Sequence, residues 1–167
     1  MIRYSEQSID KKDIEGVVQV LTSKHLTQGP LIEAFEEAIT ELTMSKYAAC
    51  VSSATAALHL TYLAAGMSKH SLVWTVANTF VATVSAAIHC GAKVDFVDIE
   101  LKNYSLCEEK LRKKLEESKK IPDFLIVVHF AGRPVDLSKI APICDHYGIK
   151  IIEDASHALG AQSNGQM

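Results

Sequence analysis

Apolar residues near the N-terminus recur at helical spacing in two sets: Ile14, Val17, Val18 and Leu21, then Leu31, Phe35, Ala38 and Leu42. Residues three and four apart lie on the same side of a helix, so each set predicts one apolar face. Asp10 precedes the first set as a candidate N-cap, and Pro30 precedes the second, where proline suits a first helical turn. We therefore expect two amphipathic helices, joined by a turn-rich loop at residues 26–30.

From residue 47 onward, short apolar runs alternate with longer segments of helical pattern. The runs predict strands at residues 47–51, 72–75, 93–97, 124–128 and 150–153. The helical segments span residues 54–65, 79–90 and 105–118, and a fourth starts after Asp136 and ends at Gly148. The second of these is apolar on nearly all sides, which predicts burial, and Ser105 with Glu108 gives the third the pattern of a capping box.

This alternation predicts an α/β fold, with a mostly parallel sheet and helices on both faces. The strand segments are continuous apolar runs, which is typical of strands covered on both sides. The polar residues 162–167 predict a turn. In open sheets of this kind, ligands bind at the carboxyl ends of the strands. The residues that follow each strand are therefore the candidates for chemistry.

The composition excludes several classes of partner. The chain has 167 residues, which suits one domain or a piece of a larger one, and its net charge of −3 offers no basic face to nucleic acid. No apolar stretch is long enough to span a bilayer, and residues 1–6 lack the apolar core of a signal peptide. The four cysteines form no Cys-x-x-Cys pair, which is typical of a reduced protein. We therefore expect a cytoplasmic protein without nucleic-acid or membrane partners.

The last predicted strand ends at the acid Glu153, a second acid, Asp154, follows directly, and His157 lies three residues beyond Asp154. Successive side chains of a strand point to opposite faces, so one acid can face a ligand while the other finds a different partner. A carboxylate at this edge is well placed to hold a cationic ring nitrogen. The alternative interpretations of Asp154 are the N-cap of the next turn and a solvated loop residue.

Two strand-to-helix turns supply further candidates. The turn at residues 52–58 opens a helix, whose free N–H groups and positive dipole end favour an anion, with hydroxyls from Ser53 and Thr55 nearby. Simple capping by serine is the alternative there, and the turn contains no glycine. In the turn at residues 78–83, Phe80 is either a ring that stacks on a flat ligand or a core phenylalanine.

Further sequence features limit the kinds of ligand that this edge of the sheet could bind. His129 ends the strand at residues 124–128, where it either reaches the site or has a structural role. No cluster of histidines and cysteines has metal-ligand spacing, and the lack of Gly-x-Gly-x-x-Gly counts against a dinucleotide-binding domain. An anion-binding turn, an aromatic ring and an acid at one sheet edge suit a planar, phosphorylated ring that contains nitrogen.

Six segments, in this order, resemble the DegT/DnrJ/EryC1/StrS sugar aminotransferases, which are fold-type I pyridoxal-phosphate enzymes. The segments are residues 26–30 (LTQGP), 52–58 (SSATAAL), 78–83 (NTFVAT), 91–99 (GAKVDFVDI), 129–136 (HFAGRPVD) and 153–161 (EDASHALGA). The last is the most specific, and the resemblance covers essentially the whole chain. The most similar branch is the one that aminates a UDP-linked 4-keto-6-deoxy sugar on the way to pseudaminic acid.

The resemblance implies both a fold and a set of site residues. The fold would be the N-terminal portion of the transferase large domain, with residues 1–30 as an N-terminal helix and first loop and residues 31–167 as an incomplete cofactor-binding domain. The cofactor would be pyridoxal 5'-phosphate, and five residues would contact it. Their implied roles are phosphate binding for Ala54 and Thr55, ring stacking for Phe80, pairing with the pyridinium nitrogen for Asp154, and a hydrogen bond to the phenolic oxygen for His157.

The resemblance also implies an activity and its partners. Asp154 and His157 would be the catalytic residues of a transamination in which the protonated ring withdraws electrons. The amino donor would be glutamate, the acceptor a nucleotide-linked keto sugar, and the complete enzyme a homodimer.

Two departures from the family pattern lead to further expectations. The family's Schiff-base lysine lies on a segment beyond residue 167, so we expect this chain alone to be inactive and its uncovered sheet edge to lower its solubility. Residues 70–77 (HSLVWTVA) also lack the glycine, acid and proline that the family usually places before the stacking segment. The alternatives are a non-catalytic remnant or cofactor-binding fragment, and a fold-type I enzyme that acts on amino acids.

Overall fold

The computed structural model describes residues 6–163 and residue 165, so half of the turn predicted at residues 162–167 lies outside the described residues. The chain forms two compact units, Met1–Cys50 and Val51–Met167, which are described separately. No helix in the described part of the chain is both long enough and apolar enough to cross a bilayer.

The first unit contains the two predicted helices, α1 (Lys11–Leu21) and α2 (Pro30–Thr43). The side chain of Asp10 caps α1 by accepting the N–H groups of Lys12 and Asp13, and Asp13 accepts the N–H of Asp10 in return at 2.8 Å. Pro30 occupies the first turn of α2, where a missing N–H costs nothing. Both predicted helix starts are therefore confirmed.

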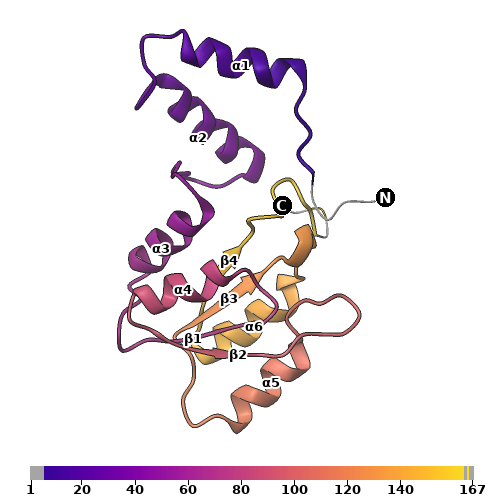
Figure 1. Ribbon diagram of the computed structural model, residues 1–167. Coiled ribbons are helices and arrows are strands. Elements are labelled where there is room, and N and C mark those ends of the chain that lie inside the picture. Colours follow the sequence, from indigo (N-terminus) through magenta and orange to yellow (C-terminus); the bar gives the residue numbers. More distant parts are fainter. Residues whose placement is uncertain (1–5, 164, 166–167) are drawn as a thin grey trace. The chain divides into compact units, whose positions relative to one another are not determined.

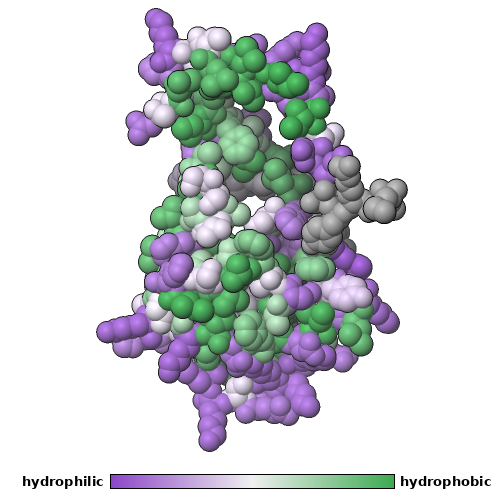
Figure 2. All heavy atoms as spheres, in the orientation of Figure 1, coloured by the Kyte–Doolittle hydropathy of each residue, from purple (hydrophilic) through white to green (hydrophobic). Residues whose placement is uncertain are grey.

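The apolar faces of α1 and α2 are not covered within the described residues. No residue of either helix is buried, and apolar side chains gather over the first unit in Figure 2. Eight large apolar side chains on the two helices are 41–64% exposed: Ile14, Val17, Val18, Leu21, Leu31, Ile32, Phe35 and Leu42. The helical spacing correctly predicted two helices, each with an apolar face, but these faces do not pack into a core within the described residues.

The second unit is an α/β layer structure around one sheet (Figure 1). Its elements in order are α3 (Ala54–Ala64), β1 (Leu72–Thr75), α4 (Val81–His89), β2 (Lys93–Phe96), α5 (Glu108–Glu117), β3 (Phe124–Val128), the short 3-10 helix η1 (Phe130–Gly132), α6 (Leu137–Tyr147) and β4 (Lys150–Asp154). The four strands are all parallel, in the order β2-β1-β3-β4. The predicted α/β class with a parallel sheet is therefore confirmed.

Two hydrophobic cores cover the two faces of this sheet. On one face, Phe124 and Ile126 of β3 pack with residues of α3 and α4. On the other, Leu125 and Val127 pack with residues of α5 and α6. All five residues of β3 are buried, which explains why this strand is an unbroken apolar run.

Several predicted details differ from the structure. Residues 47–51 form no strand, since no described strand pairs with them, and Tyr47 is 77% exposed. The expected burial also fails for β2, because an edge strand is covered less, and for the outer side of α4, where Val81 and Ile88 are exposed. α4 itself begins two residues later than predicted.

The predicted capping box at Ser105 is also wrong. α5 begins at Glu108 with Cys107 as its N-cap, and no side chain caps it. Ser105 is buried in the preceding turn instead, where its carbonyl accepts the N–H of Glu100 and its own N–H is bound by Asn103. Ser105 therefore lies in the turn before the helix, two residues before the N-cap position, and its backbone rather than its hydroxyl makes these hydrogen bonds.

Candidate functional site

Asp154 is a buried acid at the carboxyl end of β4, with only 7% of its surface exposed. Its Oδ2 atom accepts a hydrogen bond from the hydroxyl of Thr83 at 2.7 Å. Its Oδ1 atom accepts the hydroxyl of Ser156 at 2.6 Å and the Ser156 N–H at 3.3 Å. Among the described residues, no lysine, arginine or histidine pairs with this carboxylate. A buried carboxylate is normally paired, so this one is suited to a cation that the chain itself does not supply.

Glu153 points to the opposite face, as strand alternation predicts. Its Oε2 lies 2.8 Å from Nε2 of His129. The Nδ1 atom of the same ring accepts the N–H of Val135 at 3.0 Å, so Nε2 carries the proton in the neutral ring and donates it to Glu153. His129 therefore has the structural role that was one of its two interpretations, because both of its ring nitrogens are engaged away from Asp154.

Thr83 of α4, whose hydroxyl binds Asp154, makes two further hydrogen bonds. Thr79 Oγ1 lies 2.8 Å from Thr83 Oγ1, and the phenol of Tyr62 donates to the carbonyl of Thr83 at 3.1 Å. Burial, with a smaller contribution from the negative charge of Asp154, raises the pKa of Tyr62, so this phenol stays protonated and donates. The sequence pattern predicts no role for Tyr62, Thr83 or Ser156, and the i, i+4 spacing of Thr79 and Thr83 is the one signal in it that points to the contact between those two threonine side chains.

The turn at residues 52–58 lies at the start of α3. Ser53 is the N-cap, and its hydroxyl accepts the N–H of Ala56 at 3.2 Å, as expected for capping by serine. Ala54 and Thr55 are exposed in the first turn, where backbone N–H groups have no partner within the helix. Capping and anion binding are compatible here, because the cap occupies only one of the free N–H groups.

Phe80, which precedes α4, and His157, which lies in the loop after β4, both have exposed side chains. Phe80 is the N-cap residue of α4 and is 74% exposed, so the interpretation as a core phenylalanine is wrong. The side chain of His157 makes no hydrogen bond to the described residues, whereas its backbone carbonyl lies against Gly132. A Cβ atom at Gly132 would sit 2.7 Å from that carbonyl oxygen, so only glycine lets the two loops pass this closely.

The topology brings the five predicted site residues to one edge of the sheet. α4 starts just after the carboxyl end of β1, and β4 ends at Asp154 on the same edge. α3 leads into the amino end of β1 and packs beside α4, so its own start, with Ala54 and Thr55, lies at the carboxyl edge. The Tyr62–Thr83 and Thr83–Asp154 hydrogen bonds tie these three elements together.

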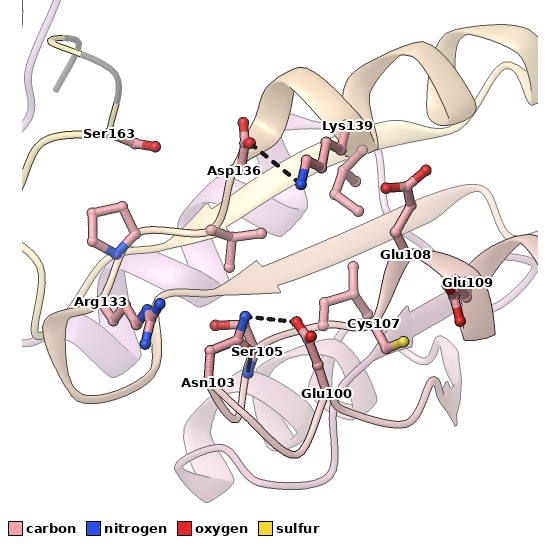
Figure 3. A pocket seen from close by; sticks show the side chains of 14 residues that line it. Glu100, Asn103, Ser105, Cys107, Glu108, Glu109, Arg133, Asp136, Lys139 and Ser163 are labelled. Carbon is pink, nitrogen blue, oxygen red and sulfur yellow. Dashed lines mark hydrogen bonds and ion pairs between the residues drawn. The ribbon is translucent and has the colours of Figure 1, made fainter.

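A separate pocket of about 540 Å³ lies on the other face of the sheet, beside the starts of α5 and α6 (Figure 3). None of the five predicted residues lines it. Three of its four acidic side chains have partners within the described residues, since Glu100 binds Asn103, Glu108 binds Arg112, and Asp136 lies near Lys139, whereas the fourth, Glu109, is exposed. The buried carboxylate of Asp154, which no cationic side chain pairs with, is therefore a better indication of the functional site than this pocket is.

Comparison with known proteins identifies the family. A profile described as the DegT/DnrJ/EryC1/StrS aminotransferase family matches residues 7–167. A UDP-4-amino-4,6-dideoxy-N-acetyl-β-L-altrosamine transaminase of Campylobacter jejuni is 40% identical over 166 residues, which are 99% of this chain and 44% of that protein. This chain thus spans less than half the length of that relative.

Solved structures agree with this match. Helicobacter pylori PseC, an aminotransferase involved in the biosynthesis of pseudoaminic acid, superimposes with a TM-score of 0.90 at 30% identity, over 98% of this chain and 44% of that one. The PLP-form of Spr1654 from Streptococcus pneumoniae, a sugar aminotransferase by its description, gives a TM-score of 0.86 at 26% identity, over 95% and 44%. Together with the profile match and the motifs in order, these similarities show that the chain belongs to the DegT/DnrJ/EryC1/StrS aminotransferase family, whose cofactor is pyridoxal phosphate.

Proposed function

We propose that an enzyme containing this chain transfers an amino group from glutamate to a UDP-linked 4-keto-6-deoxy sugar, in a pathway to an amino sugar of the pseudaminic-acid type. The similarity to the altrosamine transaminase of C. jejuni and to PseC supports the substrate class. The chain contributes the cofactor-binding edge of such an enzyme. The chain spans less than half the length of that transaminase, so we assign the reaction to an enzyme that contains the chain rather than to the chain alone.

The residues at the carboxyl edge fit pyridoxal phosphate. This cofactor carries a basic ring nitrogen, a flat ring and a phosphate. The carboxylate of Asp154, which has no cation partner, suits the ring nitrogen. The exposed ring of Phe80 suits the flat ring, and the free N–H groups at the start of α3 suit the phosphate. The single observation that carries the proposal is the buried carboxylate of Asp154, which has hydroxyl and amide donors but no cation among the described residues.

Each residue has a distinct part in the proposed mechanism. When bound, the cofactor supplies an electron sink for the carbanion of transamination. Asp154 keeps a proton on the ring nitrogen, and a protonated ring withdraws electrons more strongly. Phe80 fixes the plane of the ring, and Ala54 and Thr55 fix its phosphate end, so that the reacting atoms are held in one orientation. His157 donates a hydrogen bond to the phenolic oxygen.

The substitution Asp154→Asn tests this proposal directly. Asparagine keeps the shape of the side chain but removes the negative charge, so we expect the Kd for pyridoxal phosphate to rise at least about tenfold, the equivalent of one charge-assisted hydrogen bond. Fluorescence titration of the chain with the cofactor measures this. In an enzyme that contains the chain, the same substitution should severely reduce formation of the amino sugar from glutamate and the keto sugar, measured by mass spectrometry. Unchanged cofactor binding by the asparagine variant would remove Asp154 from its role.

A further inference from the structure

The carboxylate of Asp154 is held from a second element as well as from its own strand end. Thr83 lies 71 positions earlier in the chain, on α4, and its hydroxyl is bound to Oδ2 at 2.7 Å. Both side chains are buried, with 1% of Thr83 and 7% of Asp154 exposed. A hydrogen bond between buried groups is not weakened by competing water, so this contact fixes the carboxylate more firmly than an exposed one would.

The direction of each hydrogen bond follows from the number of protons available. An ionised carboxylate only accepts, so the single hydroxyl proton of Thr83 goes to Asp154. Thr83 Oγ1 must therefore accept in its contact with Thr79, at 2.8 Å, and the Thr79 hydroxyl donates. Tyr62 donates to the backbone carbonyl of Thr83 at 3.1 Å and makes no hydrogen bond to this hydroxyl. The proton of the Thr83 hydroxyl is therefore directed at Asp154 by the contact with Thr79, and not by Tyr62.

We propose that Thr83 is a positioning residue, whose hydroxyl fixes Oδ2 of Asp154 so that the carboxylate faces the ring nitrogen of the cofactor. This inference rests on the role proposed for Asp154. Ser156 holds the other oxygen from its hydroxyl and its N–H, so loss of the Thr83 hydroxyl leaves the carboxylate anchored at one oxygen only and free to turn. The titratable neighbours do not replace it: Tyr62 is bound to a backbone carbonyl, and the ring of His129 is bound to Glu153 and Val135.

Four variants separate positioning from a general structural effect. Thr83→Val removes the hydroxyl and keeps the branched shape, and Thr83→Ala serves if valine packs poorly. Thr83→Ser keeps the hydroxyl and should restore the wild-type behaviour. Tyr62→Phe is the matched control, because it removes a hydrogen bond to the backbone of Thr83 but leaves the bond between Thr83 and Asp154 in place.

Two measurements on the full chain test whether Thr83 positions the carboxylate of Asp154. In crystal structures, we expect the Asp154 carboxylate to be turned or split between orientations in Thr83→Val and Thr83→Ala, and to keep its place in Thr83→Ser and Tyr62→Phe. The Kd for pyridoxal phosphate should rise about tenfold in the first two variants and stay within about twofold of wild type in the others. A carboxylate that is unmoved in both Thr83→Val and Thr83→Ala would overturn the inference.

The two proposals fail separately. If Asp154→Asn binds pyridoxal phosphate as tightly as wild type, the proposed role of Asp154 is lost, whatever the crystal structures of the Thr83 variants show. If Asp154→Asn weakens binding but neither Thr83→Val nor Thr83→Ala does, the role of Asp154 stands and Thr83 is not its positioning residue. Equal weakening in Thr83→Ser and Thr83→Val would also contradict positioning by the hydroxyl.

Discussion

Gly132 shows how one residue sets the geometry of the carboxyl edge. Its φ angle is +80°, and a Cβ atom there would lie 2.7 Å from the carbonyl oxygen of His157. We expect Gly132→Ala to lower the free energy of unfolding by about 2–4 kcal/mol, because left-handed strain and a backbone clash add together. Gly148→Ala is the matched control: φ is +68° but nothing lies within 4 Å of the new Cβ, so only the strain of about 1–2 kcal/mol remains. Urea unfolding measures both, and equal losses would contradict the clash.

At this scale the sequence predicted an acid at the strand end, but not the residues that hold it. Asp154 was recognisable because an apolar strand ends at it and a family motif surrounds it. Tyr62 and Thr83 were not, since their roles depend on a contact between segments 71 positions apart. Thr83 has the same appearance in sequence as any helical threonine. Only the three-dimensional structure shows that its hydroxyl meets the carboxylate at the end of β4.

A strand at the edge of a sheet can carry charged residues that pair with a neighbouring helix, and β2 is an example. β2 lies at one edge of the sheet, and Asp95 on it pairs with Lys114 of α5 at 2.7 Å. The hydrogen bond from Lys114 holds the pKa of Asp95 below its ordinary value. A lowered carboxyl pKa gives stability that is present above the unfolded pKa and is lost as pH falls through the folded pKa.

The substitution Asp95→Asn should therefore destabilise the protein at pH 7 and not at strongly acidic pH. The side chain of Asp95 is 56% exposed, so solvent screening limits the expected loss to about 0.5 kcal/mol. Urea unfolding of both proteins at pH 7 and at pH 3 or below measures the difference, which high salt should also reduce. A difference that persists undiminished at acidic pH would show that the ion pair is not its cause.

Element predictions succeeded where local pattern and tertiary packing agree. β1 and β3 have the predicted limits, because buried parallel strands are continuous apolar runs. Residues 47–51 carry the same signal without becoming a strand, since an apolar run needs a neighbouring strand to bind, and the sequence does not say whether one is present. The capping box predicted at Ser105 was wrong for a related reason. Serine is common both at N-caps and in turns, and only the backbone conformation distinguishes the two positions.

At the scale of the whole molecule, its two units differ in how they bury apolar surface. The second unit encloses two cores on the two faces of its sheet, whereas the first leaves the apolar faces of both helices exposed. A homodimer, which the family resemblance implies for an enzyme containing this chain, would give such faces a place to be buried. Analytical ultracentrifugation of that enzyme should therefore find a dimer, and a monomer at micromolar concentration would contradict this expectation.

The contrast between the units also gives a test on the chain itself. Phe35 is 54% exposed, so Phe35→Glu removes apolar surface from solvent without opening a cavity. We expect this variant to bind less of the hydrophobic dye ANS and to change the free energy of unfolding by less than about 0.5 kcal/mol. Leu111→Ala provides the contrast, because Leu111 is fully buried and its truncation should cost about 2–5 kcal/mol without reducing dye binding. If Phe35→Glu destabilises the chain as strongly as Leu111→Ala, the face of α2 is packed rather than exposed in solution.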